Sequence, residues 1–322
     1  MDEMTEVRAL RDHVQAPDRA RIAPGRARLA EAARAGRSRR ALWLRWEFAI
    51  VATVAAVTAV AVTAGLLVGG KDSEGSAPPA GTPGVRYKGV SAAEFLREAA
   101  DAVRTQPNGP VPTAKQWIYS KAAQEPPNKS DRFPGEQESW IRYDGSATAS
   151  RIREGQPLQI TKLHLENGAE GDDRSPRELY RVLAALPADG KGTLKALRER
   201  NALADDKGEP QARNDYFEIS VLLQADVMPA EGLASLYRAL ALLPGGKVTG
   251  HLVDTAAGRR VIALEYVRGT NPKDGSSMLD QWLIDPGTYR PVGMRFVSGE
   301  GKVLGGDSLV TTAVVDKAGD RS

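Results

Sequence analysis

The sequence contains no cysteine in its 322 residues. Disulfide bonds, zinc sites with cysteine ligands and catalysis by a thiol are therefore excluded. Histidine is scarce too: only His13, His164 and His251 occur, and none has a second metal-binding side chain at the spacing of a metal motif. We expect structural or surface roles for His164 and His251, and neither a metal nor another cofactor.

Motifs that carry catalysis or bind phosphate are missing as well. The sequence has no Gly-x-Ser-x-Gly, no Ser-x-x-Lys and no complete phosphate loop. Residues 245–249 have the wrong glycine spacing for such a loop and instead predict a helix end that runs into a strand. Residues 205–208 lack the later oxygen ligands of a calcium loop, which favours a simple acidic turn. We therefore expect no enzymatic activity, although a hydrolase site that no motif reveals stays open.

Excess positive charge is confined to the N-terminal 47 residues. This segment holds 11 Arg and 7 Asp or Glu, which leaves 33 of the 44 basic and 34 of the 41 acidic residues for the rest of the chain. The remainder is close to neutral and gives no reason to expect a nucleic-acid partner. Membrane orientation and attraction to anionic lipid explain the arginines of the tail.

An uncharged run covers residues 48–70 and predicts a transmembrane helix. Its 23 residues contain no charge and no proline. As a helix they span about 34 Å, enough to cross a hydrocarbon core of about 30 Å. A buried core helix is disfavoured because the run is apolar on every face. A cleaved signal peptide is disfavoured because the run is long and 47 residues precede it.

The flanks of the span predict its orientation. Five arginines precede it closely: Arg34, Arg37, Arg39, Arg40 and Arg45. The positive-inside rule then places the N-terminus in the cytoplasm and residues 71–322 outside a cell membrane. Trp43 and Trp46 flank Arg45 where an interfacial aromatic belt is expected, so these three residues are our candidates for contact with membrane lipid.

The chain therefore divides into four parts: a cytoplasmic basic tail (1–47), a transmembrane helix (48–70), a linker (71–86) and an extracytoplasmic domain (87–322). The linker is rich in Gly, Pro, Ser and Ala. Met4–Val14 has an apolar stripe at helical spacing and could dock a cytoplasmic partner, although a mostly disordered tail is the simpler interpretation. We expect the last part to fold on its own.

The large domain begins with a helix and a run of strands. Ser91 and Glu94 form a capping-box pattern at the start of an apolar stripe. Strand-like runs follow at residues 116–121, 138–144, 147–153 and 158–165, with Asp144-Gly145 as a turn signal. These runs predict an antiparallel meander.

The spacing of the apolar residues then changes from alternation to steps of three and four, which indicates a helical block at residues 175–244. Ser175 and Glu178 form a second capping box with Pro176 at the first helical position. Strand patterns return at 248–254, 260–267, 278–285, 290–296 and 309–316. The order predicts an α+β domain: a curved antiparallel, half-barrel-like sheet with a helical insertion.

Aromatic residues concentrate in the predicted strands. Trp117, Tyr119, Trp140 and Trp282 would line an apolar groove for a lipid or peptide if they share one face of a curved sheet. Ordinary packing against the helices is the alternative. These four residues are our candidates for a ligand groove.

Several motifs resemble a family of actinobacterial single-pass membrane proteins of unassigned function. They are Arg26-Ala-Arg28-Leu29, the run Leu236–Gly245, Val253-Asp254 with Gly258-Arg259, and the turn Leu283-Ile284-Asp285-Pro286. The resemblance covers most of the chain. It implies an outer domain similar to lipoprotein-carrier and sigma-regulator half-barrels. Because such proteins are often encoded beside extracytoplasmic-function sigma factors, it also implies a sigma factor as a cytoplasmic partner of the tail.

We therefore expect a membrane-anchored, non-enzymatic regulatory or binding protein whose outer domain binds a lipid, a peptide or a partner protein. The alternative is an envelope carrier or maintenance protein that binds an apolar ligand without signalling. The tail discriminates between the two, because only signalling requires a cytoplasmic partner.

Overall fold

The computed structural model describes most of the predicted outer domain, in the ranges 87–125, 135–151, 155–163, 174–200, 202–203, 205–270 and 275–322. The tail, the predicted span at 48–70 and the linker lie outside these ranges. So do His164 and the three interface candidates Trp43, Arg45 and Trp46. No helix within the described ranges is long and apolar enough to cross a membrane.

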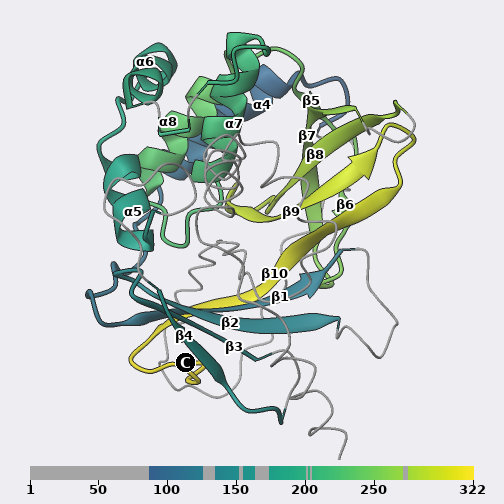
Figure 1. The fold of residues 1–322 in the computed structure, drawn as a ribbon. Helices are drawn as coiled ribbons and strands as arrows, with labels where there is room; N and C mark the ends of the chain where they lie inside the picture. Colours follow the sequence, from purple (N-terminus) through teal and green to yellow (C-terminus); the bar gives the residue numbers. More distant parts are fainter. Residues whose placement is uncertain are drawn as a thin grey trace, which may run out of the picture. The chain divides into compact units, whose positions relative to one another are not determined.

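The strands form one antiparallel sheet of ten members, which is curved and open in Figure 1. Its order is β4-β3-β2-β1-β10-β9-β8-β7-β5, with β6 paired to β7. The strands are β1 Trp117–Gln124, β2 Glu136–Arg142, β3 Ala147–Arg151, β4 Gln159–Lys162, β5 Lys247–Val248, β6 Val253–Asp254, β7 Arg260–Thr270, β8 Ser277–Ile284, β9 Pro291–Ser298 and β10 Val303–Val315. The predicted meander at the start of the domain is confirmed by the sequential pairing of β1 to β4.

Helices precede the sheet and interrupt it, which confirms the α+β class and the helical insertion. Helix α4 (Ala92–Arg104) comes before β1. In the described part of the chain between β4 and β5, the helices are α5 Pro176–Ala184, α6 Gly190–Arg200, α7 Gln211–Leu222 and α8 Ala230–Leu240. In Figure 1 the helices gather on one side of the sheet.

Both predicted capping boxes are present. The Glu94 amide donates to Ser91 Oγ at 3.2 Å, and the Ser91 amide donates to Glu94 Oε2 at 3.0 Å. Ser175 and Glu178 make the same reciprocal pair at the start of α5. Each box satisfies backbone donors that a helix N-terminus would otherwise leave without partners.

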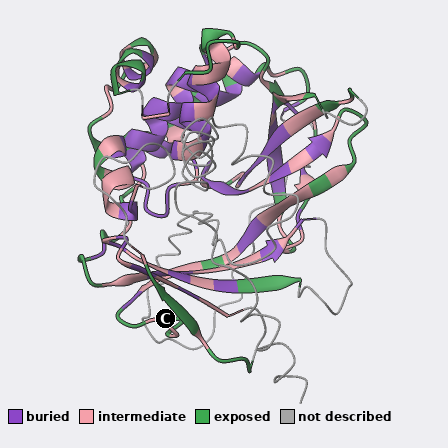
Figure 2. Ribbon diagram, viewed as in Figure 1, coloured by how far each residue is buried: buried purple, intermediate pink, exposed green. Residues whose placement is uncertain are grey.

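The main core lies between the helices and the sheet. Helix α8 is central to it, with Leu233, Leu236 and Leu240 fully buried. These side chains belong to the same cluster as Ile262 and Trp282 of strands β7 and β8. Figure 2 shows this continuous buried region as purple along α8 and the adjoining strands.

Two predicted strand boundaries are wrong. Residues 248–254 were expected to form one strand, but they contain the last residue of β5 and the whole of β6, with a bend between them. Thr249 Oγ1 donates to the His251 carbonyl at 3.0 Å within this bend, so His251 is an exposed bend residue rather than part of a strand.

The last strand begins at Val303, not at Leu309 as predicted. Gly305 and Gly306 conceal this start, because glycine interrupts the strand pattern in the sequence. A Cβ atom at Gly306 would collide with the Met294 carbonyl oxygen, and φ is +128° there. Glycine therefore allows β9 and β10 to approach closely at this point.

Candidate binding site at the edge of the sheet

Trp282 lies between the sheet and the helices, where a groove was predicted. Its side chain is packed, with an exposed fraction of 1% for the residue. Trp282 Nε1 donates to the Tyr216 hydroxyl of α7 at 3.2 Å, and that hydroxyl donates to Asp280 at 2.9 Å. Arg268 donates to the same carboxylate at 3.1 Å. Trp282 thus belongs to a filled interior with its own hydrogen-bond network.

Burial dominates the electrostatics of this interior cluster. It raises the pKa of Asp280, and the neighbouring Arg268 and Tyr216 lower the pKa only in part. Burial and the Asp280 charge raise the pKa of the Tyr216 hydroxyl well above its ordinary value. The phenol therefore stays protonated and acts as a hydrogen-bond donor, which is the role that its contact with Asp280 requires.

Trp140 and Tyr119 lie on the opposite face of the sheet. The two residues are cross-strand partners on β1 and β2, and their rings are 5.1 Å apart. The alternate residues Ile118 and Ile141 pack with Val227, which lies between α7 and α8. Because neighbouring residues of a strand point to opposite faces, Trp140 and Tyr119 face away from the helices.

The candidate groove residues are therefore not brought together. Tyr119, Trp140 and the partly buried Trp117 belong to one cluster, and Trp282 belongs to another. Trp140 is fully buried, and its Nε1 donates to the Asp320 carbonyl oxygen at 2.6 Å. The C-terminal segment thus covers Trp140 on the face away from the helices. A role for any of these residues in ligand binding stays a prediction.

A charged cluster adjoins Trp140 on this face. Glu138, two residues earlier on β2, accepts hydrogen bonds from Tyr119 at 2.8 Å and from Arg151 at 3.1 Å. Arg321 contacts the same carboxylate at 2.7 Å through Nε and at 3.0 Å through Nη2. Two guanidinium groups thus share one carboxylate, which leaves one net positive charge among these residues.

The cluster holds Glu138 in its charged form. Burial alone would raise the pKa of the Glu138 carboxyl, but hydrogen bonds from Arg321, Tyr119 and Arg151 outweigh it and lower the pKa. Burial and the bond to Glu138 raise the pKa of the Tyr119 hydroxyl well above its ordinary value. The carboxylate therefore fixes both arginines at the surface of the sheet.

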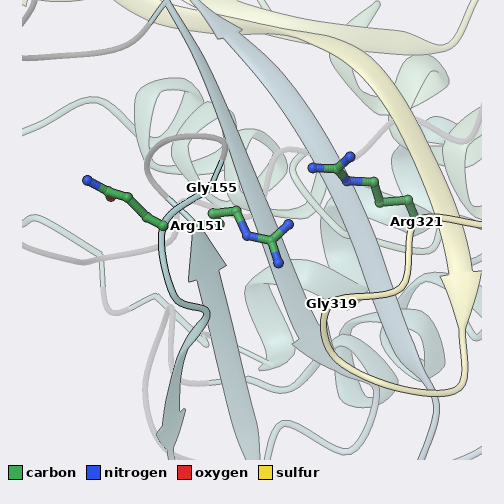
Figure 3. Close-up of a pocket in the computed structure, with 5 residues that line it drawn as sticks. Arg151, Gly155, Gly319 and Arg321 are labelled. Carbon is green, nitrogen blue, oxygen red and sulfur yellow. The ribbon is translucent and has the colours of Figure 1, made fainter.

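The two arginines line an open depression of about 590 Å³. The other described residues that line it are Gly155, Gln156 and Gly319. Figure 3 shows Arg151 and Arg321 extending toward each other from the two sides, one from β3 and the other from the C-terminal segment. The two guanidinium groups make this lining cationic, which suits an anionic group.

The depression adjoins an exposed edge of the sheet. Gly155 and Gln156 belong to the connection between β3 and β4, and β4 is the last of the described strands on this side. All four residues of β4 are exposed, and Ile160 has an exposed fraction of 60%. The exposed edge and the arginine-lined depression together form our candidate binding site.

Sequence reasoning missed this site. Glu138 and Arg151 lie in the predicted strands, but Arg321 is 183 residues from Glu138 along the chain. The alternation of apolar and polar residues along a strand shows which residues share a face of the sheet. It does not show which strand lies at the edge of the sheet. As for metals, no group of three or more potential ligands occurs among the residues that the structure describes.

Comparisons with known proteins give little further information. No family model matches the chain, and no curated protein matches it. The resemblance to an actinobacterial membrane-protein family therefore stays a prediction.

The solved structures that match include structures of MucB. The complex of MucA and MucB from Pseudomonas aeruginosa matches with 13% identity and a TM-score of 0.23, over 69% of this chain and 56% of that chain. A crystal structure of MucB with MucA(peri) matches with 14% identity and a TM-score of 0.24, over 72% and 59%. The chain thus spans less than two thirds of these proteins, and scores of this size support no argument about function.

Proposed function

We propose that the chain is a membrane-anchored regulatory protein without enzymatic activity, whose outer domain binds a protein partner. The observation that carries this proposal is the arginine-lined depression beside the exposed strand β4. A cationic depression next to unpaired backbone suits a polypeptide, which offers both carboxylates and peptide groups.

Packing of the aromatic residues argues against a lipid as the ligand. A carrier for an apolar molecule needs an apolar space of about 300 Å³ or more. Three of the four side chains expected to line such a space, Tyr119, Trp140 and Trp282, have exposed fractions of 2% or less, and Trp117 is partly buried. They contact residues of the chain itself, so a ligand would have to displace those contacts.

The N-terminal parts complete the proposal. The span at 48–70 anchors the protein in a cell membrane, with the tail in the cytoplasm and the described domain outside. The tail is the part that would contact a sigma factor, through Met4–Val14. The arginine-rich flank of the span supports this orientation. The apolar stripe of the tail and the family resemblance of the sequence support the contact with a sigma factor.

Photocrosslinking in the host cell tests this function. A photoreactive amino acid replaces, one at a time, the exposed apolar residues Val111, Ile160, Leu242, Val267 and Leu304 of the full-length chain. We expect a defined protein adduct from at least one position, identified by mass spectrometry. A sixth probe at Leu10 reports on contact of the tail with a sigma factor. Adducts with lipid alone from the five outer positions would contradict the proposal and support the carrier alternative.

A further inference from the structure

We propose that the partner supplies an extended acidic segment, which adds to the sheet as a new strand along β4 and places a carboxylate against Arg151 and Arg321. This inference rests on the proposed function, because it names the surface and the chemistry of the same partner. It follows from the backbone of β4, from the side chain of Ile160 and from the charges at the ends of the strand.

The backbone of β4 has unpaired groups along its outer side. The Leu163 amide donates to the Ser146 carbonyl at 2.9 Å, and residues 163 and 146 are opposite each other in the register of β4 with β3. In an antiparallel ladder, residues that bond the neighbouring strand alternate with residues that do not. Residues 161 and 159 therefore bond β3, and the peptide groups of Ile160 and Lys162 point outward.

The outward groups are accessible to another chain. In the ranges that the structure describes, neither the amide nor the carbonyl of Ile160 or Lys162 has a hydrogen bond to a residue beyond the ladder. Both residues are exposed, as are the other two members of β4. An added strand would satisfy these donors and acceptors and would extend the ladder by one member.

The side chain of Ile160 gives an added strand something to bury. Its cross-strand partner is Ala149, which is opposite Trp140, which is in turn opposite Tyr119. These four residues form a row across the sheet that is buried at Tyr119 and open at Ile160, with an exposed fraction of 60% at the edge. A β-branched or aromatic residue on an added strand would cover Ile160 and continue the row.

Charge selects which strand can add. Among the described residues that line the depression, the charged ones are Arg151 and Arg321, and Lys162 stands at the far end of β4. Lysine on a short edge strand discourages pairing with neutral or basic strands. Carboxylates on an incoming strand reverse that effect, because they pair with Lys162 at one end and with the guanidinium groups at the other.

Selected peptides provide the test. A phage library of random 12-residue peptides is selected on the full-length chain in lipid nanodiscs, and enriched sequences are labelled for fluorescence anisotropy. We expect β-branched residues alternating with Asp and Glu, and binding that weakens as salt rises. Enrichment of basic peptides, or of none, would overturn the inference.

Proline variants separate strand addition from other modes of binding. Ile160→Pro and Lys162→Pro each remove an outward donor and leave the ladder to β3 intact. We expect each to weaken peptide binding about tenfold or more, with a smaller loss for Ile160→Thr, which keeps the donor. Val111→Pro, at an exposed residue outside the sheet, is the matched control. Unchanged binding by both β4 proline variants would refute strand addition.

Hydrogen exchange keeps the inference testable if a proline variant fails to fold. In the wild-type chain we expect the amides of residues 158–163 to exchange at least tenfold more slowly when the selected peptide is bound. No change in this segment would count against the edge site. The two proposals can also fail separately: a protein adduct in the crosslinking scan with no role for β4 removes only this inference, whereas lipid adducts alone remove the proposed function.

Discussion

Buried carboxylates set the response of the domain to pH at the scale of single residues. Asp226, between α7 and α8, is 4% exposed, and burial raises its pKa to about 7. Asp307 on β10 is only half-buried as a residue, and its pKa is also raised to about 7, by burial of the carboxyl group and by the Glu125 charge. Glu138 is the opposite case, since its arginine partners lower its pKa and keep it charged.

The Asp226→Asn variant should be more stable than the wild type, and the difference should grow with pH. Because the pKa of Asp226 is higher in the folded state than the value of about 4 in the unfolded chain, the folded state binds more protons between pH 4 and 7. The stability that this difference in proton binding gives to the folded state is fully present below about pH 4 and is lost as pH rises toward about 7. The variant removes this loss, which amounts to at most about 4 kcal/mol.

Urea unfolding at pH 4 and pH 8, followed by tryptophan fluorescence, measures this difference. Asp254→Asn is the control, because the Asp254 side chain is 88% exposed. We expect that control to change stability equally at both pH values. An Asp226→Asn variant that is equally destabilised at both pH values would show that the carboxylate is charged and well solvated in the folded domain.

At the scale of elements, the sequence predicts local structure well where one short motif determines it. Ser91 with Glu94, and Ser175 with Glu178, place two helix starts correctly. Asp285-Pro286-Gly287 predicts the β8–β9 turn: Asp285 Oδ1 accepts hydrogen bonds from the Gly287 and Thr288 amides at 3.0 and 2.8 Å. In each case the partners are two or three residues apart, so the pattern itself contains the interaction.

The first capping box should contribute measurably to stability. Ser91→Ala leaves the Glu94 amide without its side-chain acceptor, and we expect a loss of about 1 kcal/mol in the free energy of unfolding. A double-mutant cycle with Glu94→Ala checks the cause, since the two side chains act as one unit and their effects should be less than additive. If the two losses in the free energy of unfolding, measured in urea, were fully additive, the capping box would not be the cause of the destabilisation.

At the scale of the whole molecule, the sequence predicts the class of the fold but not its strand order. Trp117 pairs with Val315, so the first and last long strands are neighbours. Alternation predicts that both are strands, but it contains no information about which distant strand each one meets. The same limit explains the aromatic residues: Trp140 and Trp282 lie on opposite faces because of pairings between residues far apart in the chain.

The candidate site depends on the same long-range geometry. Arg321 reaches Glu138 because the C-terminal segment folds back across β2, and Ile160 is exposed because no strand among the described residues follows β4 in the sheet. Neither fact has a local signature. A binding function stays a prediction from the sequence, and nothing in the sequence indicates this surface.

The orientation in the membrane is the central claim of this account. The described domain can bind a partner outside the cytoplasm only if the single span places that domain outside the cell membrane. The measurement is protease treatment of intact protoplasts that carry the full-length chain with one epitope before Met1 and another after Ser322. We predict that protease removes the C-terminal epitope and spares the N-terminal one, and that detergent exposes both. Protection of the C-terminal epitope in intact protoplasts, with loss of the N-terminal one, would contradict the orientation and with it the proposed function.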